Sequence, residues 1–243
     1  MKEGKGLLIV LEGPDDCGKS TLAKMAIDNL NSMGYSTTHL REPGGVELSE
    51  HLRRIILDPE NTHKLDALTR AMLFGASRSH FVAQRLKPEL DKGNVVVQER
   101  YILSTKAYQG YGDGINHEQL NTLCEMASRG VKPDITFILE TRRSFDMRSL
   151  DTKEFMGKPD AFEAKGPEFQ RRVWHGYLEL QRKDPENIKL VPYLDLIKES
   201  LPSEETLMMY RKLRLEMMFN HIEPLLHKYG ENINRQSGVG SVS

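Results

Sequence analysis

Short apolar runs alternate with longer amphipathic stretches along most of this chain. The clearest run, residues 94–99, carries three consecutive valines and is bounded by Lys92 and Gly93. Runs of this kind predict five strands, at Leu7–Glu12, Ser36–Arg41, Asn94–Glu99, Asp134–Glu140 and Ile188–Pro192. A strand that is apolar throughout is typical of a parallel sheet buried on both faces.

The stretches between these runs repeat apolar residues with the 3.6-residue period of a helix. They predict helices at Thr21–Met33, Val46–Leu57, Leu65–Leu90, Glu118–Arg129, Phe162–Arg182 and Glu204–Lys228. Strands and helices that alternate in this way predict an α/β fold, with helices on both faces of a parallel sheet. Ligands of such folds bind where the carboxyl ends of the strands meet their loops.

Two stretches show neither period. Residues 151–166 are rich in Lys, Gly, Pro and acidic residues, and we expect them to form a mobile lid. Residues 231–243 are small and polar, and we expect a disordered tail there. Residues 1–230 are then expected to form one domain, since a chain of this length can bury a sizeable core.

Composition narrows the class of protein. Hydrophobic residues make up 38% and charged residues 28% of the chain, which suits a globular protein, and the net charge is −1. Such a balance gives no basic field for a nucleic acid polymer, and no apolar run has the length of a membrane span. Only two cysteines, Cys17 and Cys124, are present, which fits the reducing cytoplasm.

The most informative motif is GPDDCGKS at Gly13–Ser20, which lies between a predicted strand and a predicted helix. Its glycines let the loop curl so that backbone N–H groups point at phosphate oxygens, and the helix N-terminus adds further donors. Lys19 is expected to reach the outer phosphates, and the Ser20 hydroxyl to bind Mg²⁺. The sequence therefore predicts a site for a nucleoside triphosphate. Its residues are Gly13, Pro14, Asp15, Asp16, Cys17, Gly18, Lys19, Ser20 and Thr21.

Further motifs follow in order along the chain. They are Arg41–Gly45 (REPGG), Phe74–Arg78 (FGASR), Glu99–Tyr101 (ERY), Ala107–Gly110 (AYQG) and Pro133–Thr136 (PDIT). Together with the phosphate loop, in this order and spacing, they resemble the thymidylate kinase family of nucleoside monophosphate kinases over residues 7–177. The resemblance implies a three-layer fold of the P-loop NTPase type with five parallel strands. It also implies phosphoryl transfer from ATP to dTMP with Mg²⁺, giving dTDP and ADP, by a homodimer.

The resemblance assigns residues to the acceptor nucleotide. It implies that Phe74 stacks on the pyrimidine and that Arg78, one helical turn later, donates hydrogen bonds to it. By pattern alone, Phe74 fits an ordinary helix core equally well, and Arg78 fits a surface cation. Arg53 and Arg100 are implied to clamp the acceptor phosphate, because an arginine binds two oxygens at once. The full acceptor set is Asp15, Glu42, Pro43, Arg53, Phe74, Arg78, Arg100, Ser104, Tyr108 and Gln109.

The chain departs from the family pattern at two places. Glu99 stands where the family usually has Asp, and we expect it to hold Mg²⁺ through a bound water. The family's catalytic arginine is absent both from the phosphate loop, which has Asp16, and from the lid motif at residues 160–163 (DAFE). A cation on the transferring group speeds phosphoryl transfer, so Arg148 is the favoured substitute. The expected catalytic groups are Asp15, Lys19, Arg100, Arg148 and Lys153, with Lys158 as a further candidate.

Three other functions stay open from the sequence. A kinase for dUMP or a modified pyrimidine monophosphate would share the phosphate loop and Arg53 and would differ only in the base pocket. An ATP-hydrolysing switch would end an apolar strand in an acidic pair, whereas here the third strand ends in Gln98, Glu99 and Arg100. An inactive binding module is disfavoured by the intact Lys19 and Ser20.

Overall fold

The computed structural model describes residues 6–61, 64–141, 161–194, 203–230 and 233. Parallel strands form one sheet in the order β2-β3-β1-β4-β5. The strands are β1 (Leu7–Glu12), β2 (Thr37–Arg41), β3 (Val95–Glu99), β4 (Ile135–Leu139) and β5 (Ile188–Val191). Each lies within one residue of its predicted bounds, so the predicted α/β class and five-stranded parallel sheet are confirmed.

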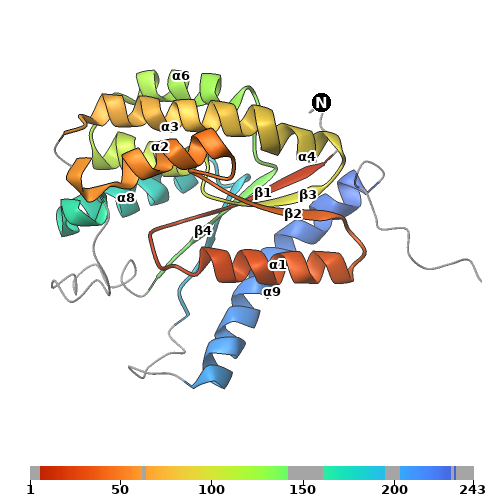
Figure 1. Cartoon of the computed structure of the whole chain (residues 1–243). Helices are drawn as coiled ribbons and strands as arrows, with labels where there is room; N and C mark the ends of the chain where they lie inside the picture. The colour runs from red at the N-terminus through yellow and green to blue at the C-terminus, as the bar shows by residue number, and fades with distance from the viewer. Residues whose placement is uncertain (1–5, 62–63, 142–160, 195–202, 231–232, 234–243) are drawn as a thin grey trace, which may run out of the picture.

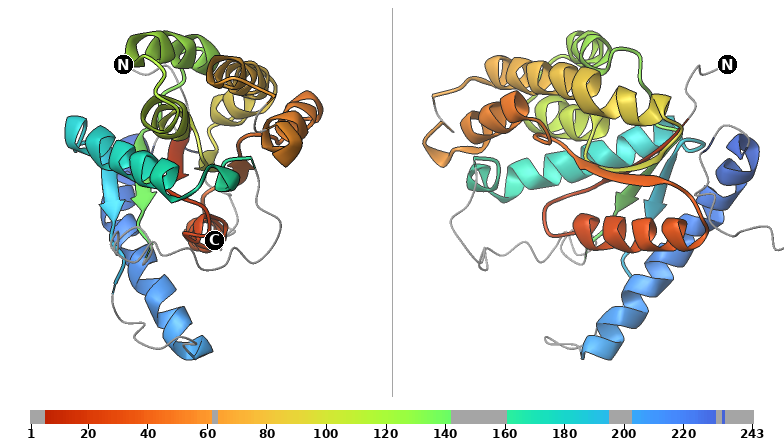
Figure 2. Two further views of the ribbon diagram at one scale, coloured as in Figure 1. Left: turned by 90° about the vertical axis from the view of Figure 1, so that its left-hand side faces the viewer. Right: turned by 45° about the vertical axis from the view of Figure 1, so that its right-hand side comes forward.

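Helices cover both faces of this sheet. Helices α1 and α9 lie on one face, and α2, α3, α6 and α8 lie on the other (Figure 1). Figure 2 shows from two further sides that α9 runs past α1 and β5. The long helices are α1 (Lys19–Ser32), α2 (Glu47–Leu57), α3 (Ala67–Phe81), α6 (His117–Ser128), α8 (Pro167–Lys183) and α9 (Glu204–Tyr229). Shorter helices are α4 (Lys87–Asp91) and α5 (Ile102–Thr105). Two π-helical turns (Val82–Leu86, Lys106–Gly112) and two 3₁₀ turns (Pro59–Asn61, Glu163–Lys165) complete the set for the described residues.

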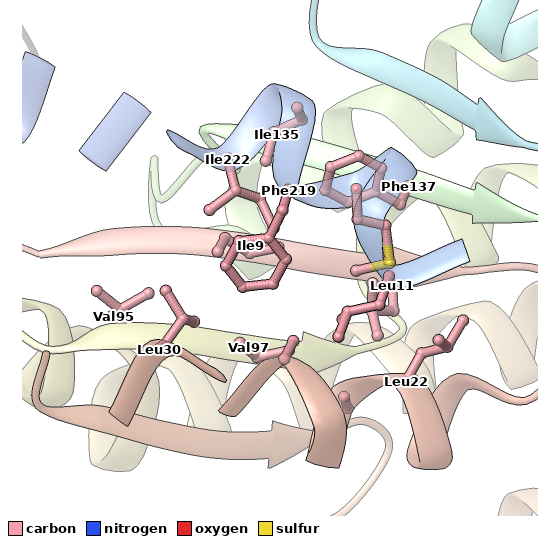
Figure 3. Packing of buried hydrophobic residues seen from close by; sticks show 14 of the residues in the cluster. Ile9, Leu11, Leu22, Leu30, Val95, Val97, Ile135, Phe137, Phe219 and Ile222 are labelled. Carbon is pink, nitrogen blue, oxygen red and sulfur yellow. The ribbon is translucent and has the colours of Figure 1, made fainter. Parts of the chain in front are cut away.

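The alternation of side chains along β1 explains how both faces are buried. Leu7, Ile9 and Leu11 point to the face covered by α1 and α9, where their side chains pack in one apolar cluster (Figure 3). That cluster includes Leu22 and Leu30 from α1 and Phe219 and Ile222 from α9. Leu8 and Val10 belong to a second cluster on the opposite face. The sheet is therefore a rigid base from which the loops at its carboxyl edge project.

The helix expected at residues 65–90 is continuous but not uniform. It starts at Ala67, because the Asp66 side chain accepts a hydrogen bond from the backbone N–H of Thr69 and so caps the helix. It then passes through the π-helical turn Val82–Leu86 and ends at Asp91. The predicted element is thus present, with an insertion in its hydrogen-bond ladder that the apolar period did not reveal.

The helix expected from Phe162 begins later than predicted. Gly166 has a φ of 81°, a left-handed conformation, and Pro167 occupies the first helical turn, so α8 starts at Pro167. The preceding residues 161–166 were expected to belong to a mobile lid. Instead, Ala161 and Phe162 are buried against the domain. Residues 151–160 of that lid, and the expected tail at 231–243 apart from the buried Ile233, lie outside the described residues.

One helical segment escaped prediction altogether. Residues 102–112, which form α5 and the following π-helical turn, were read only as motif residues after the third strand. Gly112 explains why, because a Cβ there would lie 2.6 Å from the Phe169 ring of α8. The glycine permits close packing but removes the apolar period that indicates a helix. None of the described helices combines the length and apolar character that crossing a membrane would require.

Candidate active site

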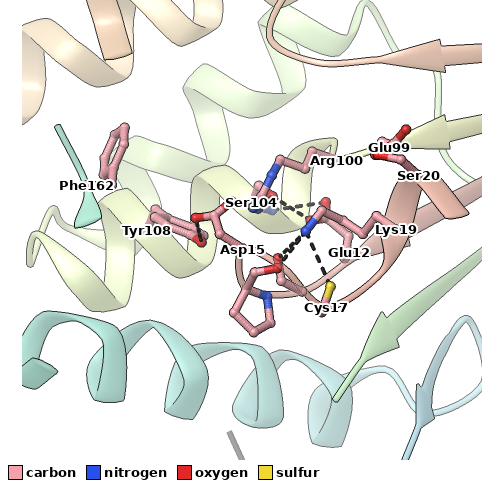
Figure 4. A network of polar contacts seen from close by, with 12 residues as sticks. Glu12, Asp15, Cys17, Lys19, Ser20, Glu99, Arg100, Ser104, Tyr108 and Phe162 are labelled. Carbon is pink, nitrogen blue, oxygen red and sulfur yellow. Dashed lines mark hydrogen bonds and ion pairs between the residues drawn. The ribbon is translucent and has the colours of Figure 1, made fainter. Parts of the chain in front are cut away.

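The loop between β1 and α1 curls around its own lysine. Gly13 and Gly18 have φ values of 132° and 86°, and a Cβ at Gly13 would lie 2.7 Å from the Leu139 carbonyl oxygen. Lys19 Nζ donates to the carbonyl oxygens of Pro14 at 2.6 Å and of Gly13 at 3.3 Å (Figure 4). Burial, with the Arg100 charge in addition, lowers the pKa of Lys19. The ammonium group is therefore held inside the curl, where this motif binds phosphate.

Ser20 and Glu99, the two predicted Mg²⁺ ligands, lie in contact. Ser20 Oγ donates to Glu99 Oε2 at 2.7 Å, and His39 Nε2 pairs with Glu99 Oε1 at 2.8 Å. Burial opposes ionisation of Glu99, but the hydrogen bonds from His39 and Ser20 outweigh it and lower its pKa. The carboxylate and hydroxyl oxygens suit Mg²⁺. No described part of the chain contains three grouped His, Cys, Asp or Glu side chains that could hold a metal.

Arg100 lies at the centre of the polar network. Its φ of 60° is left-handed, and its backbone N–H donates to the Leu11 carbonyl at 2.8 Å. Its guanidinium donates from Nη2 to Asp15 Oδ1 at 2.5 Å and from Nη1 to Ser104 Oγ at 3.1 Å. Burial opposes ionisation of Asp15, but the charges of Arg100 and Lys19 outweigh it and lower the pKa of this carboxyl. Asp15 is therefore an ionised partner that orients Arg100.

Glu12 is a site residue that the sequence reading missed. It ends β1, is fully buried, and accepts hydrogen bonds from the backbone N–H groups of Tyr101 at 2.7 Å and Ser104 at 3.0 Å. Its second oxygen accepts from Ser104 Oγ at 2.5 Å and from the Tyr177 hydroxyl at 3.1 Å. Glu12 thereby fixes the start of α5 and the Ser104 hydroxyl that Arg100 contacts. An acidic residue that ends an apolar strand directly before Gly13 is the signal that could have found it.

An aromatic pocket opens on one side of this network. Phe74 and Phe162 both line it and contact each other, with ring centroids 5.9 Å apart. Phe74 is thus part of the pocket wall as well as of the apolar cluster beneath it, and its stacking on a pyrimidine stays a prediction. Gln109 is 1% exposed, and its Nε2 atom has no hydrogen-bond partner among the described residues. The remaining lining residues are Asp15, Glu42, Pro43, Arg53, Leu57, Arg78, Arg100, Ser104, Thr105 and Tyr108.

Arg78 is not the surface cation that its sequence position also allowed. It is 3% exposed, and its Nε donates to Glu42 Oε2 at 2.7 Å. Its Nη2 donates to the Tyr101 carbonyl at 2.9 Å. Burial raises the pKa of Glu42 although the Arg78 charge opposes the shift. The buried pair fixes the direction in which the arginine meets the pocket.

A second cavity lies over the phosphate loop, and it shares residues with the aromatic pocket. It is lined by Lys19, Ser20, Thr21 and Glu99, together with the arginines of the expected phosphate clamp. Asp15, Glu42, Arg53 and Arg100 line both cavities. Arg53 reaches this junction from α2, where its Nη1 donates to the Pro43 carbonyl at 3.0 Å. The residues predicted for the two nucleotides therefore meet at one place.

A family model for thymidylate kinase matches residues 11–223 of the chain. The chain belongs to the thymidylate kinase family. The thymidylate kinase of Exiguobacterium sibiricum is 35% identical over 202 residues, which cover 82% of this chain and 92% of that protein. The thymidylate kinase of Nostoc punctiforme is 38% identical over 190 residues, which cover 75% of this chain and 86% of that protein. In the crystal structure of thymidylate kinase from Ehrlichia chaffeensis, 96% of the chain matches 86% of this one, with a TM-score of 0.65 and 27% identity.

Membership of the thymidylate kinase family confirms the resemblance drawn from the ordered motifs. It disfavours the ATP-hydrolysing switch, because the match extends far beyond the phosphate loop through the acceptor motifs. It does not locate the catalytic cation. Arg148, Lys153 and Lys158 all lie outside the described residues.

A third cavity beside the phosphate loop was not foreseen. It begins at Asp16, Gly18 and Thr21, which also line the phosphate cavity. Its far wall comes from the segments after β4 and β5 and from the first turns of α9. The residues of that wall are Glu140, Thr141, Tyr193, Leu207, Tyr210, Arg211 and Arg214. No motif marked them, because they are spread over three segments that only the fold brings together.

Proposed function

We propose that this chain transfers the γ-phosphoryl group of ATP to the 5′-phosphate of dTMP, giving dTDP and ADP. The observation that carries the proposal is the junction of the two cavities at Asp15, Glu42, Arg53 and Arg100. One cavity contains the phosphate loop, and the other is an aromatic pocket of the kind that suits a flat base. Two nucleotides bound there would meet phosphate to phosphate between two arginines.

The transfer needs positioning and charge neutralisation more than covalent chemistry. An oxygen of the acceptor phosphate attacks the γ-phosphorus, the bond to the bridging β–γ oxygen breaks, and ADP leaves. Lys19 and the loop N–H groups hold the donor phosphates, while Arg53 and Arg100 hold the acceptor phosphate. When bound, Mg²⁺ supplies further positive charge, and Ser20 and Glu99 would hold it, directly or through water.

The third cavity suits the base of ATP. It continues from the phosphate cavity at Gly18 and Thr21, and it carries the rings of Tyr193 and Tyr210, whose centroids are 5.9 Å apart. Aromatic side chains of this kind pack well against a purine ring. In this arrangement the donor base and the acceptor base lie on opposite sides of the phosphate loop.

The acceptor pocket suits a pyrimidine monophosphate, and the family match favours dTMP over dUMP as that acceptor. Phe74 offers a stacking surface, and Arg78 and Gln109 offer donors to the polar edge of a pyrimidine. A single methyl group changes binding by only about 1–3 kcal/mol, so both monophosphates fit this chemistry. An ADP-release assay with Mg-ATP and dTMP, dUMP, dCMP, dGMP or no acceptor tests the proposal. Turnover with dTMP above all others supports it, and ADP release that no monophosphate changes contradicts it.

The cation that completes the transition state is proposed to be Arg148, with Lys153 and Lys158 as substitutes. Residues 161–166, the described end of the expected lid, contain one cation, Lys165. That cation is already engaged by other residues, which supports a role for one of the three candidates. Lys165 forms an ion pair with Asp113, and its ammonium lies 4.8 Å from the centroid of the Phe169 ring.

A homodimer through the helices is also part of the proposal. Helices α2, α3 and α6 pack side by side and expose large apolar side chains. They are Leu48, Ile55, Leu68, Met72 and Met126. A second copy of the chain would cover such a face. Light scattering on Met72→Glu tests this dimer, and Met209→Glu on α9 is the matched control. Loss of the dimer in Met72→Glu alone supports the proposed interface. A dimer that persists in both variants contradicts it. We also propose that the protein works in the cytoplasm, a compartment that keeps free thiols such as Cys17 and Cys124 reduced.

A further inference from the structure

Arg214 of α9 lies buried behind the phosphate loop. It is 3% exposed, and its Nη1 donates to the Cys17 carbonyl oxygen at 3.2 Å. Its Nη2 donates to the carbonyl oxygens of Glu140 at 3.0 Å and Val191 at 3.3 Å. These three acceptors belong to the phosphate loop, the end of β4 and the end of β5. One side chain from the last helix therefore ties the loop to the sheet edge.

The charge of this arginine has no carboxylate partner in the described residues. None of the ion pairs among them involves Arg214, and its Nε atom has no acceptor in that part of the chain. A buried cation is costly unless hydrogen bonds and opposite charge compensate it. Three carbonyl oxygens supply the hydrogen bonds here. An anion bound on the other side of the phosphate loop would supply the opposite charge.

The geometry of the peptide bond links Arg214 to that anion. The Cys17 carbonyl and the Gly18 N–H belong to one planar trans peptide, so they point in opposite directions. Fixing the carbonyl on the guanidinium therefore turns the N–H away from α9, and polarisation through the peptide makes it a stronger donor. Lys19, the next residue, starts α1 and carries the loop's own cation.

We propose that Arg214 is a positioning residue for the donor triphosphate, acting through the Cys17–Gly18 peptide of the phosphate loop. The inference rests on the proposed function, because it assigns this loop to ATP. It links two features of α9. The Arg214 guanidinium carbon lies 5.4 Å from the centroid of the Tyr210 ring, and Tyr210 lines the cavity proposed for the ATP base. The acceptor pocket contains no described residue of α9, and its one loop residue, Asp15, is held by Arg100, so we expect Arg214 to act chiefly on ATP.

The test measures ATP and dTMP binding separately, by calorimetry with Mg²⁺ and one nucleotide at a time. We expect Arg214→Met to raise the Kd of ATP about tenfold or more, since hydrogen bonds to a charged group are lost. The Kd of dTMP should change by less than about twofold. Lys212→Met removes the same charge from the exposed face of α9 and should leave both constants unchanged.

Arg214→Lys keeps the charge but cannot fork between separate carbonyls, so it should weaken ATP binding by a smaller factor. If Arg214→Met does not fold, the Kd of ATP in Arg214→Lys tests the proposal instead. An unchanged Kd of ATP in the folded variant, or an equal loss for both nucleotides, overturns the proposal. This test measures binding of one nucleotide at a time and does not depend on turnover. A failure to phosphorylate dTMP would therefore contradict the proposed function without deciding whether Arg214 positions ATP.

Discussion

The Arg100 guanidinium and the Asp15 carboxylate form an ion pair where the two nucleotide cavities join, with Nη2 and Oδ1 2.5 Å apart. Ser104 holds the other terminal nitrogen, and the Tyr108 ring lies under the guanidinium carbon at 5.4 Å. Arg100 is therefore preorganised before any phosphate arrives. A preorganised cation can neutralise charge in phosphoryl transfer without first rearranging.

Replacing Arg100 by Lys should lower kcat/KM for dTMP about 100-fold, because lysine cannot bind Asp15, Ser104 and a phosphate at once. Steady-state kinetics with dTMP varied at saturating ATP would measure this. Arg182→Lys, on the exposed end of α8, is the matched control and should have no effect. Wild-type kcat/KM in Arg100→Lys would remove this residue from the acceptor site.

Replacing Lys19 by Ala should abolish turnover, because the loop would lose the cation that its carbonyl oxygens now hold over the phosphate site. The control is Lys24→Ala, which removes an exposed lysine of the same helix. ADP release with dTMP is the measurement for both. Retained activity in Lys19→Ala would contradict the assignment of the phosphate loop.

Replacing Glu42 by Gln should lower the stability of the fold and raise the KM of dTMP. Arg78 would keep its charge at a site where it is 3% exposed, and breaking such a buried pair costs about 3 kcal/mol. The KM of dTMP should rise about tenfold as Arg78 loses its orientation, while the KM of ATP stays near the wild-type value. Urea unfolding and steady-state kinetics test the two parts, with exposed Glu47→Gln as the control. Equal changes in both KM values would argue for a general loss of structure.

Replacing Glu89 by Gln should make stability less dependent on pH. Hydrogen bonds from Lys92, Thr38 and Asn94 lower the pKa of Glu89 to about 2 from an ordinary 4.5, although burial opposes the shift. The ionised group therefore contributes stability above about pH 4.5, and that contribution is lost as the pH falls toward 2. We expect the variant to be about 1–2 kcal/mol less stable at pH 7, with the difference shrinking below pH 4.5. Urea unfolding from pH 3 to pH 7 would show a constant difference if the pKa of Glu89 were ordinary.

Replacing Arg148 by Ala should lower kcat about 100-fold if this residue is the cation on the transferring group. The KM values for both substrates should change little, since the interaction belongs to the transition state. An unchanged kcat would exclude Arg148, and the same assay on Lys153→Ala and Lys158→Ala would then identify the substitute.

The strands and the phosphate loop were predictable because each depends on local sequence. An unbroken apolar run such as Val95–Val97 has few alternatives to a buried strand, and the glycines of the loop are required by its curl. The helix start at Pro167 was missed because the apolar period continues back to Phe162, which is buried by tertiary contacts rather than by a helix.

The missed parts of the site depend on contacts between distant segments. Glu12 was overlooked because its four donors come from Tyr101, Ser104 and Tyr177. The buried state of Arg78 depends in the same way on Glu42. No spacing in the sequence marks either set of contacts, although the acidic residue directly before Gly13 is a local signal for Glu12 itself. Family resemblance found Arg78, and nothing in the family motifs found Glu12.

The hydrogen bond from Arg214 to Cys17 joins residues that are 197 positions apart. During synthesis, the phosphate loop emerges from the ribosome long before Arg214 does. Strands β1, β3 and β4 can pair while α9 is still to be made, so the growing chain can shape its acceptor pocket before its donor loop is fixed. The contact that ties the phosphate loop to α9 can therefore form only after almost the whole described chain has been made.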